Sequence, residues 1–320
     1  TPFQIETRGD LVVLKTAEAT AEVSRETGAV RFLDENGQEV LKERPGSREL
    51  SPVTVEDQKG DHRFLATRQV WESPDDEAFY GLGQHQQGVM NYKGHDVQLA
   101  QHNIDVGIPL VVSSRNYGVL WDNNSITRFG DPRPYGMIAD QFIVRDATGR
   151  FGGLTASYYQ NDQLKVQRQE TEVNYEFIRE WSRWPEGFKS QPGQPVQTGD
   201  MGKPGQAGVK VVWEGTLETA TAGLHKFRLY SSGYAKVWID ERMVEDNWRQ
   251  NWNPFDHDFQ VQMAANTRVP IKIEWIPEDG YISLRHQDPL PAADQGALSL
   301  ASEVGTAIDY YYIGGDNLDG

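Results

Sequence analysis

The feature of this sequence that most constrains its fold is an alternation of apolar and polar residues with a period of two. Apolar, β-branched and aromatic residues recur in this way in many short segments, which Gly, Asn, Asp and Pro separate. A period of two is typical of strands with one buried face, whereas an amphipathic helix repeats about every 3.6 residues. The clearest segments are Leu11–Lys15, Ile108–Ser113, Tyr117–Trp121, Val209–Trp213, His225–Tyr230, Ala235–Ile239, Val269–Trp275 and Ile308–Ile313.

Turn-forming residues lie between these segments, as expected for strands joined by tight connections. Examples are Glu35-Asn36-Gly37, Asp146-Ala147-Thr148-Gly149 and Asp279-Gly280. Long helical patterns are nearly missing, and Glu172–Ile178 is the best short helical candidate. The sequence therefore predicts an all-β fold built from sandwiches or barrels.

Two breaks in composition divide the chain. Thr148–Gly153 is rich in Gly and is interpreted as a linker, and Asp288–Asp294 is a crossing rich in Pro and Ala. The segment between them has the size of a whole domain. We therefore predict one domain formed by residues 1–150 plus 290–320, interrupted by a second domain formed by residues 154–287.

The ends of the two predicted domains carry further expectations. The short strand Ile308–Ile313 cannot form a domain alone, so it is expected to complete the sheet begun by residues 1–150.

Within the insert, the loop Gln191–Gly208 is rich in Gly and Pro and is interpreted as a surface excursion. After the last strand, Asp316 is a plausible helix N-cap with no helix to cap, which suggests a fragment, although a frayed natural terminus is the alternative.

Composition limits the classes of partner. The chain has 320 residues and a formal net charge of −16, and it contains nine Trp and no Cys. An acidic surface repels phosphate groups, so nucleic acids and anionic membranes are not expected partners, whereas neutral sugars are compatible. The lack of Cys excludes disulfides and thiolate sites. No apolar run approaches the roughly 18 residues of a membrane helix, and the N-terminal residues do not resemble a signal peptide.

An ordered set of motifs lies between residues 79 and 123. The motifs are FYGLGQHQ at 79–86, NYKG at 91–94, Asn103-Ile104-Asp105, IPLVVSS at 108–114 and NYGVLWDN at 116–123. This set resembles the N-terminal, galactose-mutarotase-like β-sandwich of glycoside hydrolase family 31. The last predicted strand, followed by a Gly-x-Asp sequence, is similar to the family's strand before a (β/α)8 barrel. Residues 314–320 would then begin the linker to that barrel.

The predicted insert resembles a PA14 module, a β-barrel or sandwich. LTASYY at 154–159 is similar to its opening strand, and VVWEGTL at 211–217 is similar to its core strand. SSGYAKVWID at 231–240 and Trp248-Arg249 are similar to its most characteristic stretch. A PA14 insertion in a family 31 sandwich is similar to the bacterial α-xylosidases that trim xyloglucan oligosaccharides.

The resemblance implies a retaining glycosidase with one carboxylate as nucleophile and another as acid/base. In the family both are aspartates of the barrel, so this chain is expected to be the non-catalytic N-terminal part, inactive alone. An α-xylosidase acting on xyloglucan-type oligosaccharide is the leading interpretation, with an associated barrel as partner and a bacterial, exported location. The alternatives are an α-glucosidase or transglucosidase of the same family, or a stand-alone carbohydrate-binding protein.

The resemblance also implies substrate-binding residues in the sandwich. The loop with Asn103 and Asp105 corresponds to a family loop at the barrel mouth, although His102 stands where the family usually has Trp. Amide and carboxylate groups suit sugar hydroxyls. Gln84 and His85, with the neighbouring Gln86, are expected at the rim of the pocket. The alternative for the Gly81-Leu82-Gly83 sequence beside them is a simple tight turn.

The insert offers one further candidate, Trp252, whose indole lies in a polar loop and could stack on a sugar. By contrast, Trp213, Trp238 and Trp275 lie within predicted strands and are expected in the core, and Trp248 is expected to pack inward. No metal is expected, because the seven His residues show no zinc-site spacing and the insert has no Asp-Asp pair for calcium. No cofactor is expected either.

Overall fold

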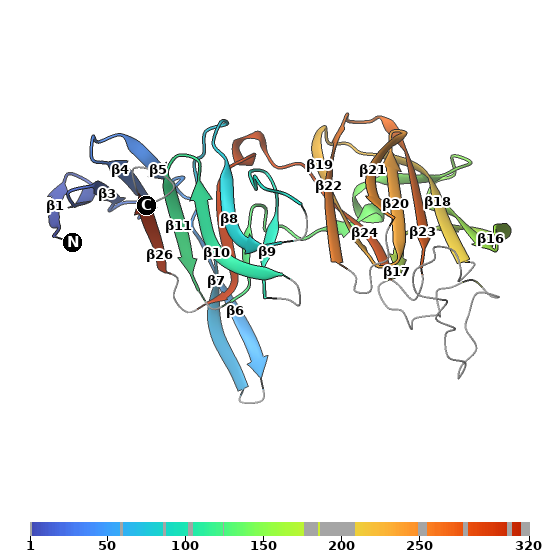
Figure 1. Ribbon diagram of the computed structural model, residues 1–320, viewed down its shortest axis with the longest axis horizontal. Helices are drawn as coiled ribbons and strands as arrows, with labels where there is room; N and C mark the ends of the chain where they lie inside the picture. Colours follow the sequence, from blue (N-terminus) through green and yellow to red (C-terminus); the bar gives the residue numbers. More distant parts are fainter. Residues whose placement is uncertain are drawn as a thin grey trace. The chain divides into compact units, whose positions relative to one another are not determined.

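The computed structural model describes residues 2–57, 60–85, 88–101, 105–123, 125–175, 185, 209–248, 255–277, 281–305 and 309–314. In this part of the chain nearly all regular structure is β, and the α-helix is the short α1 (Ile138–Gln141) (Figure 1). The predicted all-β fold is confirmed. No helix among the described residues is long and apolar enough to cross a membrane. The chain forms two compact units: unit 1 comprises Thr1–Pro132 and Leu290–Gly320, and unit 2 comprises Arg133–Pro289.

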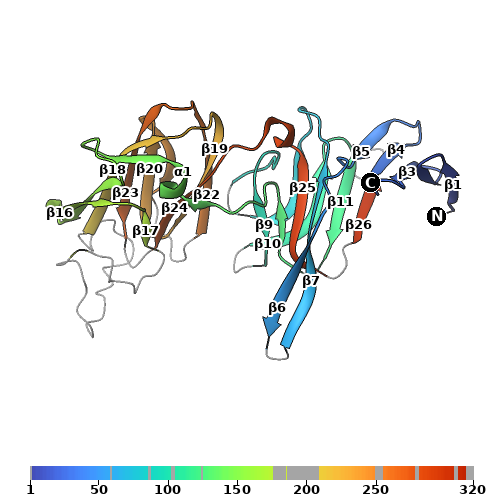
Figure 2. The same ribbon diagram turned by 180° about the vertical axis from the view of Figure 1, so that it is seen from behind.

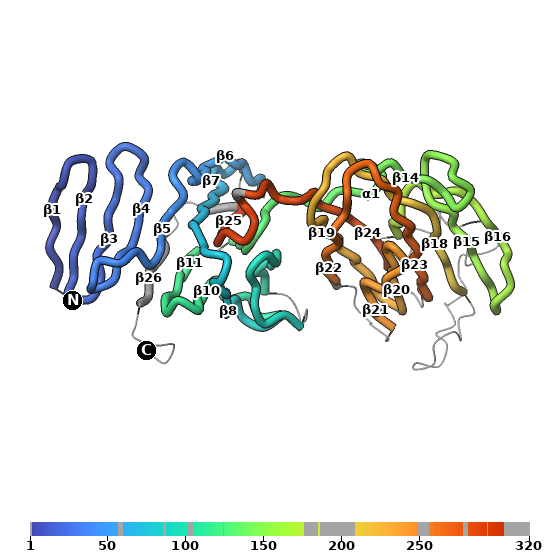
Figure 3. Tube along the Cα trace, turned by 90° about the horizontal axis from the view of Figure 1, so that it is seen from above, coloured from blue at the N-terminus to red at the C-terminus, as the bar shows by residue number. Residues whose placement is uncertain are grey.

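Unit 1 begins with an antiparallel meander in which each strand pairs with the next (Figure 3). Short turns join these strands, and Gly37 in the predicted turn after Glu35 has a φ of 77°. The strands are β1 (Gln4–Arg8), β2 (Leu11–Lys15), β3 (Ala19–Ser24), β4 (Val30–Asp34) and β5 (Glu39–Lys42).

The rest of unit 1 is a sandwich of two sheets, with strand orders β26-β11-β10-β8 and β6-β7-β25-β12-β9. Large apolar side chains from both sheets form one core, including Trp71, Phe79, Trp121, Phe129 and Leu300. The strands are β6 (Glu49–Asp57), β7 (Gly60–Trp71), β8 (Phe79–Gln84), β9 (Val97–Leu99), β10 (Val106–Ser113), β11 (Tyr117–Asp122), β12 (Thr127–Phe129), β25 (Leu298–Gly305) and β26 (Asp309–Gly314).

The last two strands return to unit 1 after the chain has formed unit 2 (Figure 2). β25 lies between β7 and β12, and β26 pairs antiparallel with β11. Both sheets of the sandwich therefore need residues from the C-terminal segment. The tail strand completes a sheet begun by the N-terminal residues, as its sequence predicted.

Unit 2 is also built from two sheets, around a core that contains Trp213, Trp275, Tyr158 and Phe227. One sheet has the order β13-β24-β19-β22, with β17 also paired to β24, and the other has the order β16-β15-β18-β23-β20-β21, with β14 paired to β18. The strands are β13 (Gly136–Met137), β14 (Ile143–Asp146), β15 (Leu154–Gln160), β16 (Gln163–Glu170), β17 (Asn174–Tyr175), β18 (Val209–Glu218), β19 (Gly223–Ser231), β20 (Tyr234–Ile239), β21 (Arg242–Asn247), β22 (Phe255–Met263), β23 (Arg268–Ile276) and β24 (Ile282–Gln287).

The helix predicted at Glu172–Ile178 is wrong for the residues that the structure describes. Asn174 and Tyr175 form β17 and pair with Ser283 and Ile282 of β24. Tyr175 is buried, and its hydroxyl donates a hydrogen bond of 3.0 Å to Glu170 Oε1. Pairing and burial of this aromatic side chain outweigh the weak local helical pattern.

The compact unit 2 begins before the predicted insert at 154–287, because residues 133–150 also belong to it. β13 pairs with β24 and β14 pairs with β18, both within that unit. The predicted linker at 148–153 follows β14 as a turn, in which Asp146 Oδ1 accepts hydrogen bonds from the backbone N–H groups of Thr148 and Arg150, both at 2.9 Å. The predicted excursion at 191–208 lies outside the described residues.

Hydrogen bonds join the first and last residues of unit 2. The Arg133 guanidinium donates a hydrogen bond of 2.7 Å to the backbone carbonyl of Asp288, and Gln287 Nε2 donates one of 2.7 Å to the carbonyl of Arg133. A unit whose entry and exit are adjacent can be accommodated in a connection of another domain.

Candidate functional site

The Gly81-Leu82-Gly83 sequence positions the candidate residues of unit 1. It is not a tight turn but the interior of β8, with φ values of 93°, 62° and 100°. A Cβ at Gly83 would lie 1.8 Å from the Val106 carbonyl oxygen, so only glycine allows β10 to approach this closely. The pairing of β10 with β8 is irregular between Gly107 and Val111. Leu82 meanwhile is fully buried.

This local geometry brings three predicted site residues to one end of the β8–β10 pair. Gln84 is the last residue of β8 and lies opposite Val106, while Asp105 directly precedes β10. His85 follows β8, and its Nε2 lies 2.8 Å from the Leu82 carbonyl oxygen. Its ring packs edge-on against Tyr92, with a centroid distance of 6.2 Å.

Asp105 has an unusual environment for a carboxylate. Its Oδ1 is buried and has no hydrogen-bond donor within the part of the chain that the structure describes. A buried acceptor without a donor costs about 1–3 kcal/mol or more. This oxygen can therefore accept one further hydrogen bond from any donor that reaches it. His102 and Asn103, together with Gln86 and Trp252, lie outside the described residues, so their predicted roles stay predictions.

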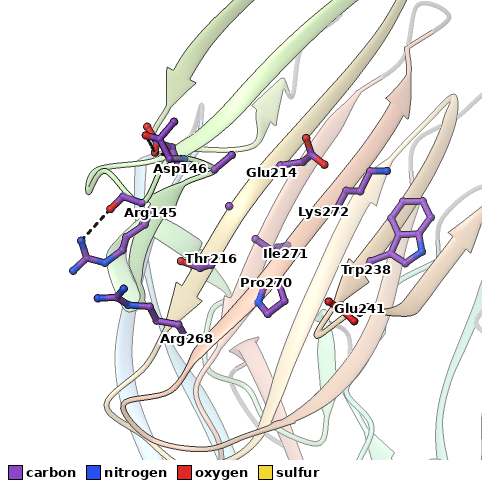
Figure 4. A pocket seen from close by; sticks show the side chains of 14 residues that line it. Arg145, Asp146, Glu214, Thr216, Trp238, Glu241, Arg268, Pro270, Ile271 and Lys272 are labelled. Atoms are coloured by element: carbon purple, nitrogen blue, oxygen red, sulfur yellow. Dashed lines mark hydrogen bonds between the residues drawn. The ribbon is translucent and has the colours of Figure 1, made fainter.

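A second candidate is a depression of about 730 Å³ on unit 2 (Figure 4). It lies over β14, β18, β23 and β20, on the face opposite the core, because Trp213, Leu217, Val237 and Ile273 of these strands point inward. Several charged side chains and one indole line it together with short apolar groups. The lining includes Arg145, Glu214, Thr216, Trp238, Glu241 and Lys272.

Trp238 is the aromatic group of this depression, and the expectation that it lies in the core is wrong. It is only partly buried, because its neighbours Val237 and Ile239 occupy the inward positions of β20. Lys272 Nζ lies 5.1 Å from its ring centroid. Trp213 and Trp275, by contrast, are fully buried as predicted. The alternation along Val237–Ile239 was the signal that could have placed Trp238 outward.

Polar groups surround Trp238 in the depression. Lys272 also hydrogen bonds to Glu274, which raises the pKa of the Lys272 ammonium and keeps it charged. Glu214 and Glu241 add carboxylates. An aromatic ring with hydrogen-bonding groups beside it can bind a sugar ring by its apolar face and its hydroxyls. Trp248 lies elsewhere and packs edge-on against Tyr234, with a centroid distance of 5.7 Å.

A third group of chemically capable side chains is buried in unit 2. The rings of His225 on β19 and His286 on β24 are fully buried, and His225 Nδ1 lies 2.8 Å from His286 Nε2. The Asp288 carboxylate lies 3.9 Å from His225 Nδ1. Burial lowers the pKa of His225 and that of His286, the latter to about 3. Sequence spacing could not reveal this group, because strand pairing brings distant residues together.

Unit 1 is thus a β-sandwich with polar side chains at one strand end, and a second β unit interrupts its chain. Residues 1–129 match the family described as the glycosyl hydrolase 31 N-terminal galactose mutarotase-like domain, and residues 152–292 match the PA14 domain. The chain therefore carries a glycosyl hydrolase 31 N-terminal domain together with a PA14 domain, and both predicted resemblances are confirmed.

The chain is similar to α-xylosidases and to a family 31 glucosidase. The chain is 44% identical to a GH31 α-xylosidase from Xanthomonas citri of known structure, with a TM-score of 0.87, covering 100% of this chain and 33% of that one. An α-xylosidase of Saccharolobus solfataricus is 33% identical over 126 residues, which are 35% of this chain and 17% of the relative. An uncharacterized family 31 glucosidase of Pseudescherichia vulneris is 43% identical over 56 residues, 18% of this chain and 11% of the relative. The chain thus spans a third or less of these proteins.

Proposed function

We propose that this chain is the non-catalytic N-terminal part of a retaining α-xylosidase that releases xylose from xyloglucan oligosaccharides. The observation that carries the proposal is the 44% identity and TM-score of 0.87 to the Xanthomonas citri α-xylosidase over the whole chain, across both units. In a retaining glycosidase, two carboxylates about 5–5.5 Å apart act as nucleophile and acid/base. The proposal assigns both to an associated (β/α)8 barrel and gives this chain a part in substrate binding.

In this proposal the end of the β8–β10 pair forms part of the rim of the substrate pocket. Asp105 would accept a hydrogen bond from a sugar hydroxyl through its buried, unsatisfied Oδ1. Gln84 and His85 lie at the same strand end. Asn103 and His102 complete the proposed set of rim residues.

Unit 2 is proposed to bind the extended part of the oligosaccharide. The outward Trp238 and its charged neighbours support this role, and Trp252 is proposed as a second aromatic contact. Contacts to remote sugar units supply binding energy that a short substrate cannot use. A long oligosaccharide should therefore depend on unit 2 more than an aryl glycoside does.

A chimera tests the proposal. Residues 1–320 replace the corresponding N-terminal third of the Xanthomonas citri α-xylosidase, and the chimera and the isolated chain are assayed on an aryl α-xyloside. We expect activity within about tenfold of the parent enzyme for the chimera and none for the isolated chain. A folded chimera without activity, or an active isolated chain, would contradict the proposal.

The second candidate function is that of an α-glucosidase or transglucosidase, which the 43% identity to a family 31 glucosidase over 56 residues favours. The natural protein that carries residues 1–320 distinguishes the two when it is assayed with aryl α-xyloside and aryl α-glucoside. A higher kcat/KM for the glucoside would favour the second candidate. A stand-alone carbohydrate-binding protein would bind xyloglucan oligosaccharides without hydrolysing either substrate.

A further inference from the structure

The two buried histidines of unit 2 raise a question of proton placement. His225 Nε2 lies 2.9 Å from the backbone carbonyl oxygen of Thr221, which can only accept a hydrogen bond. His225 must therefore carry its proton on Nε2. The Nδ1 atom of the neutral ring then presents a lone pair, and this atom faces His286.

The same reasoning applies to His286 from the other side. Its Nδ1 is hydrogen bonded to the amide oxygen of Gln141 in α1, which again only accepts. The proton of a neutral His286 therefore lies on Nδ1, and Nε2 presents a lone pair. With the Gln141 amide in this orientation, two lone pairs face each other across 2.8 Å, an arrangement that a cation between them would stabilise.

The side chains around this point have the composition of a metal site. We propose that His225, His286 and Asp288 bind a divalent transition-metal ion of the zinc type. Their three ligand atoms all lie within 4.8 Å of one another. Two imidazole nitrogens and one carboxylate oxygen form a common zinc donor set that leaves a fourth position for water.

The outer partners of the two rings match those of metal-bound histidines. Such rings donate their second N–H to a backbone carbonyl or another acceptor, which fixes the tautomer and the ring orientation. Thr221 supplies the carbonyl for His225, and Gln141 supplies the amide oxygen for His286. Phe142, beside Gln141, packs on the His286 ring at a centroid distance of 4.4 Å and limits its rotation.

Binding requires a small adjustment and an entry path. Two nitrogens on a tetrahedral zinc lie about 3.3 Å apart, given Zn–N bonds of about 2.0–2.1 Å. The present distance is 2.8 Å, so the rings must separate by a fraction of an ångström. The Asp288 side chain is 44% exposed, which gives an ion access from solvent. A bound ion would then cross-link β19, β24 and Asp288 at the C-terminal end of unit 2.

Two features oppose the metal. Arg133 is a positive charge close enough to lower the pKa of His286, and it reduces the affinity for any cation. An amide of Gln141 turned by 180° would instead donate to His286, which could then donate to His225 in a plain hydrogen-bonded chain. This series of hydrogen bonds is complete without a metal, so the two arrangements predict different results.

Zinc titration of the full chain, after removal of metals with EDTA, tests the proposal. We expect one zinc ion per chain by calorimetry, and a rise of several degrees in Tm at a hundredfold excess over Kd. Cobalt(II) should give the visible spectrum of a tetrahedral site. No zinc-dependent heat or Tm shift would overturn the proposal.

Variants make the test specific. Asp288→Asn should weaken zinc binding at least tenfold and leave the metal-free Tm unchanged, because the side chain is partly exposed. His62→Gln, at an exposed position of β7 in unit 1, should leave zinc binding unchanged. A zinc affinity that Asp288→Asn leaves unchanged, or that His62→Gln abolishes, would overturn the proposal.

Gln141→Glu separates the metal site from the hydrogen-bonded chain. A carboxylate can only accept from His286 Nδ1, so it favours the metal-binding tautomer and should strengthen zinc binding several-fold. The metal-free series of hydrogen bonds needs a donor at position 141. It therefore predicts that Gln141→Glu has a lower Tm and binds no zinc. The second result would overturn the proposal.

Discussion

Asp146 shows how one residue sets a local structure. It is 5% exposed, and its Oδ1 accepts hydrogen bonds from the Thr148 hydroxyl at 2.6 Å and from the backbone N–H groups of Thr148 and Arg150. The hydrogen bond from the Thr148 hydroxyl is the main cause of its lowered pKa. The same Gly-rich stretch looked like a linker in the sequence, because side-chain capping of a turn leaves no periodic signal.

The lowered pKa of Asp146 predicts a pH dependence of stability. The folded pKa lies below the unfolded value of about 3.9, so the stabilisation is fully present above about pH 4 and is lost as the pH falls through the folded pKa. Asp146→Asn keeps an acceptor but removes the charge. Its deficit in Tm relative to the native chain should be largest at pH 7 and should shrink towards pH 2. A deficit independent of pH would contradict this assignment.

The outward position of Trp238 gives a prediction about binding. Trp238→Ala should weaken the binding of a xyloglucan oligosaccharide to the chain several-fold, because one stacked ring contributes on the order of 1 kcal/mol. Its Tm should change little, since the side chain is only partly buried. Trp213→Ala is the matched control, in which loss of a fully buried ring should lower the Tm sharply. Unchanged oligosaccharide affinity in Trp238→Ala would exclude the platform role.

At the scale of elements, the period-two pattern predicted the strands well because burial on one face is a local property of the sequence. Leu11–Lys15 is β2 without any change of bounds, and Val269–Trp275 lies within β23. The candidate site was harder to predict. Gln84 and Asp105 lie at the same end of the β8–β10 pair, and this register depends on glycines that admit a neighbouring backbone. Such a long-range contact has no signature in local periodicity.

Gly83 therefore gives a prediction at this scale. Gly83→Ala should lower the free energy of unfolding by about 2–5 kcal/mol, because a methyl group would overlap the Val106 carbonyl and φ is strongly positive. Gly9→Ala is the control, since Gly9 has a φ of 60° and nothing lies within 4 Å of its Cβ position. It should cost only about 1 kcal/mol from backbone strain. Urea unfolding measures both, and equal effects would show that the close approach to β10 is unimportant.

At the scale of the whole molecule, the composition breaks indicated an inserted unit at 154–287, and the compact unit 2 begins earlier, at Arg133. The exit near Pro289 coincides with the Pro- and Ala-rich crossing. A connection between units lies outside the sheets, so few of its backbone N–H groups need a hydrogen-bond partner and Pro is tolerated. The entry at Arg133 also lies in a stretch rich in Gly and Pro, GDPRPYG at 130–136, so composition alone does not decide which of the two breaks begins the unit. β13 and β14 are short and gain their stability from β24 and β18, whose pairing the local sequence does not reveal.

The difference between the two boundaries can be tested by excision. Removing residues 133–289 and joining Pro132 to Leu290 through a short linker should leave a folded unit 1, because all three of its sheets keep all their strands. Removing only residues 154–287 leaves β13, α1 and β14 without their partners β24 and β18. That product should show a lower Tm, and proteases should remove the unpaired segment 133–153 rapidly. Circular dichroism melts and limited proteolysis of the two proteins, side by side, make the comparison. If the second product is as stable and as protease-resistant as the first, residues 133–150 do not depend on unit 2, and the boundary at Arg133 is wrong.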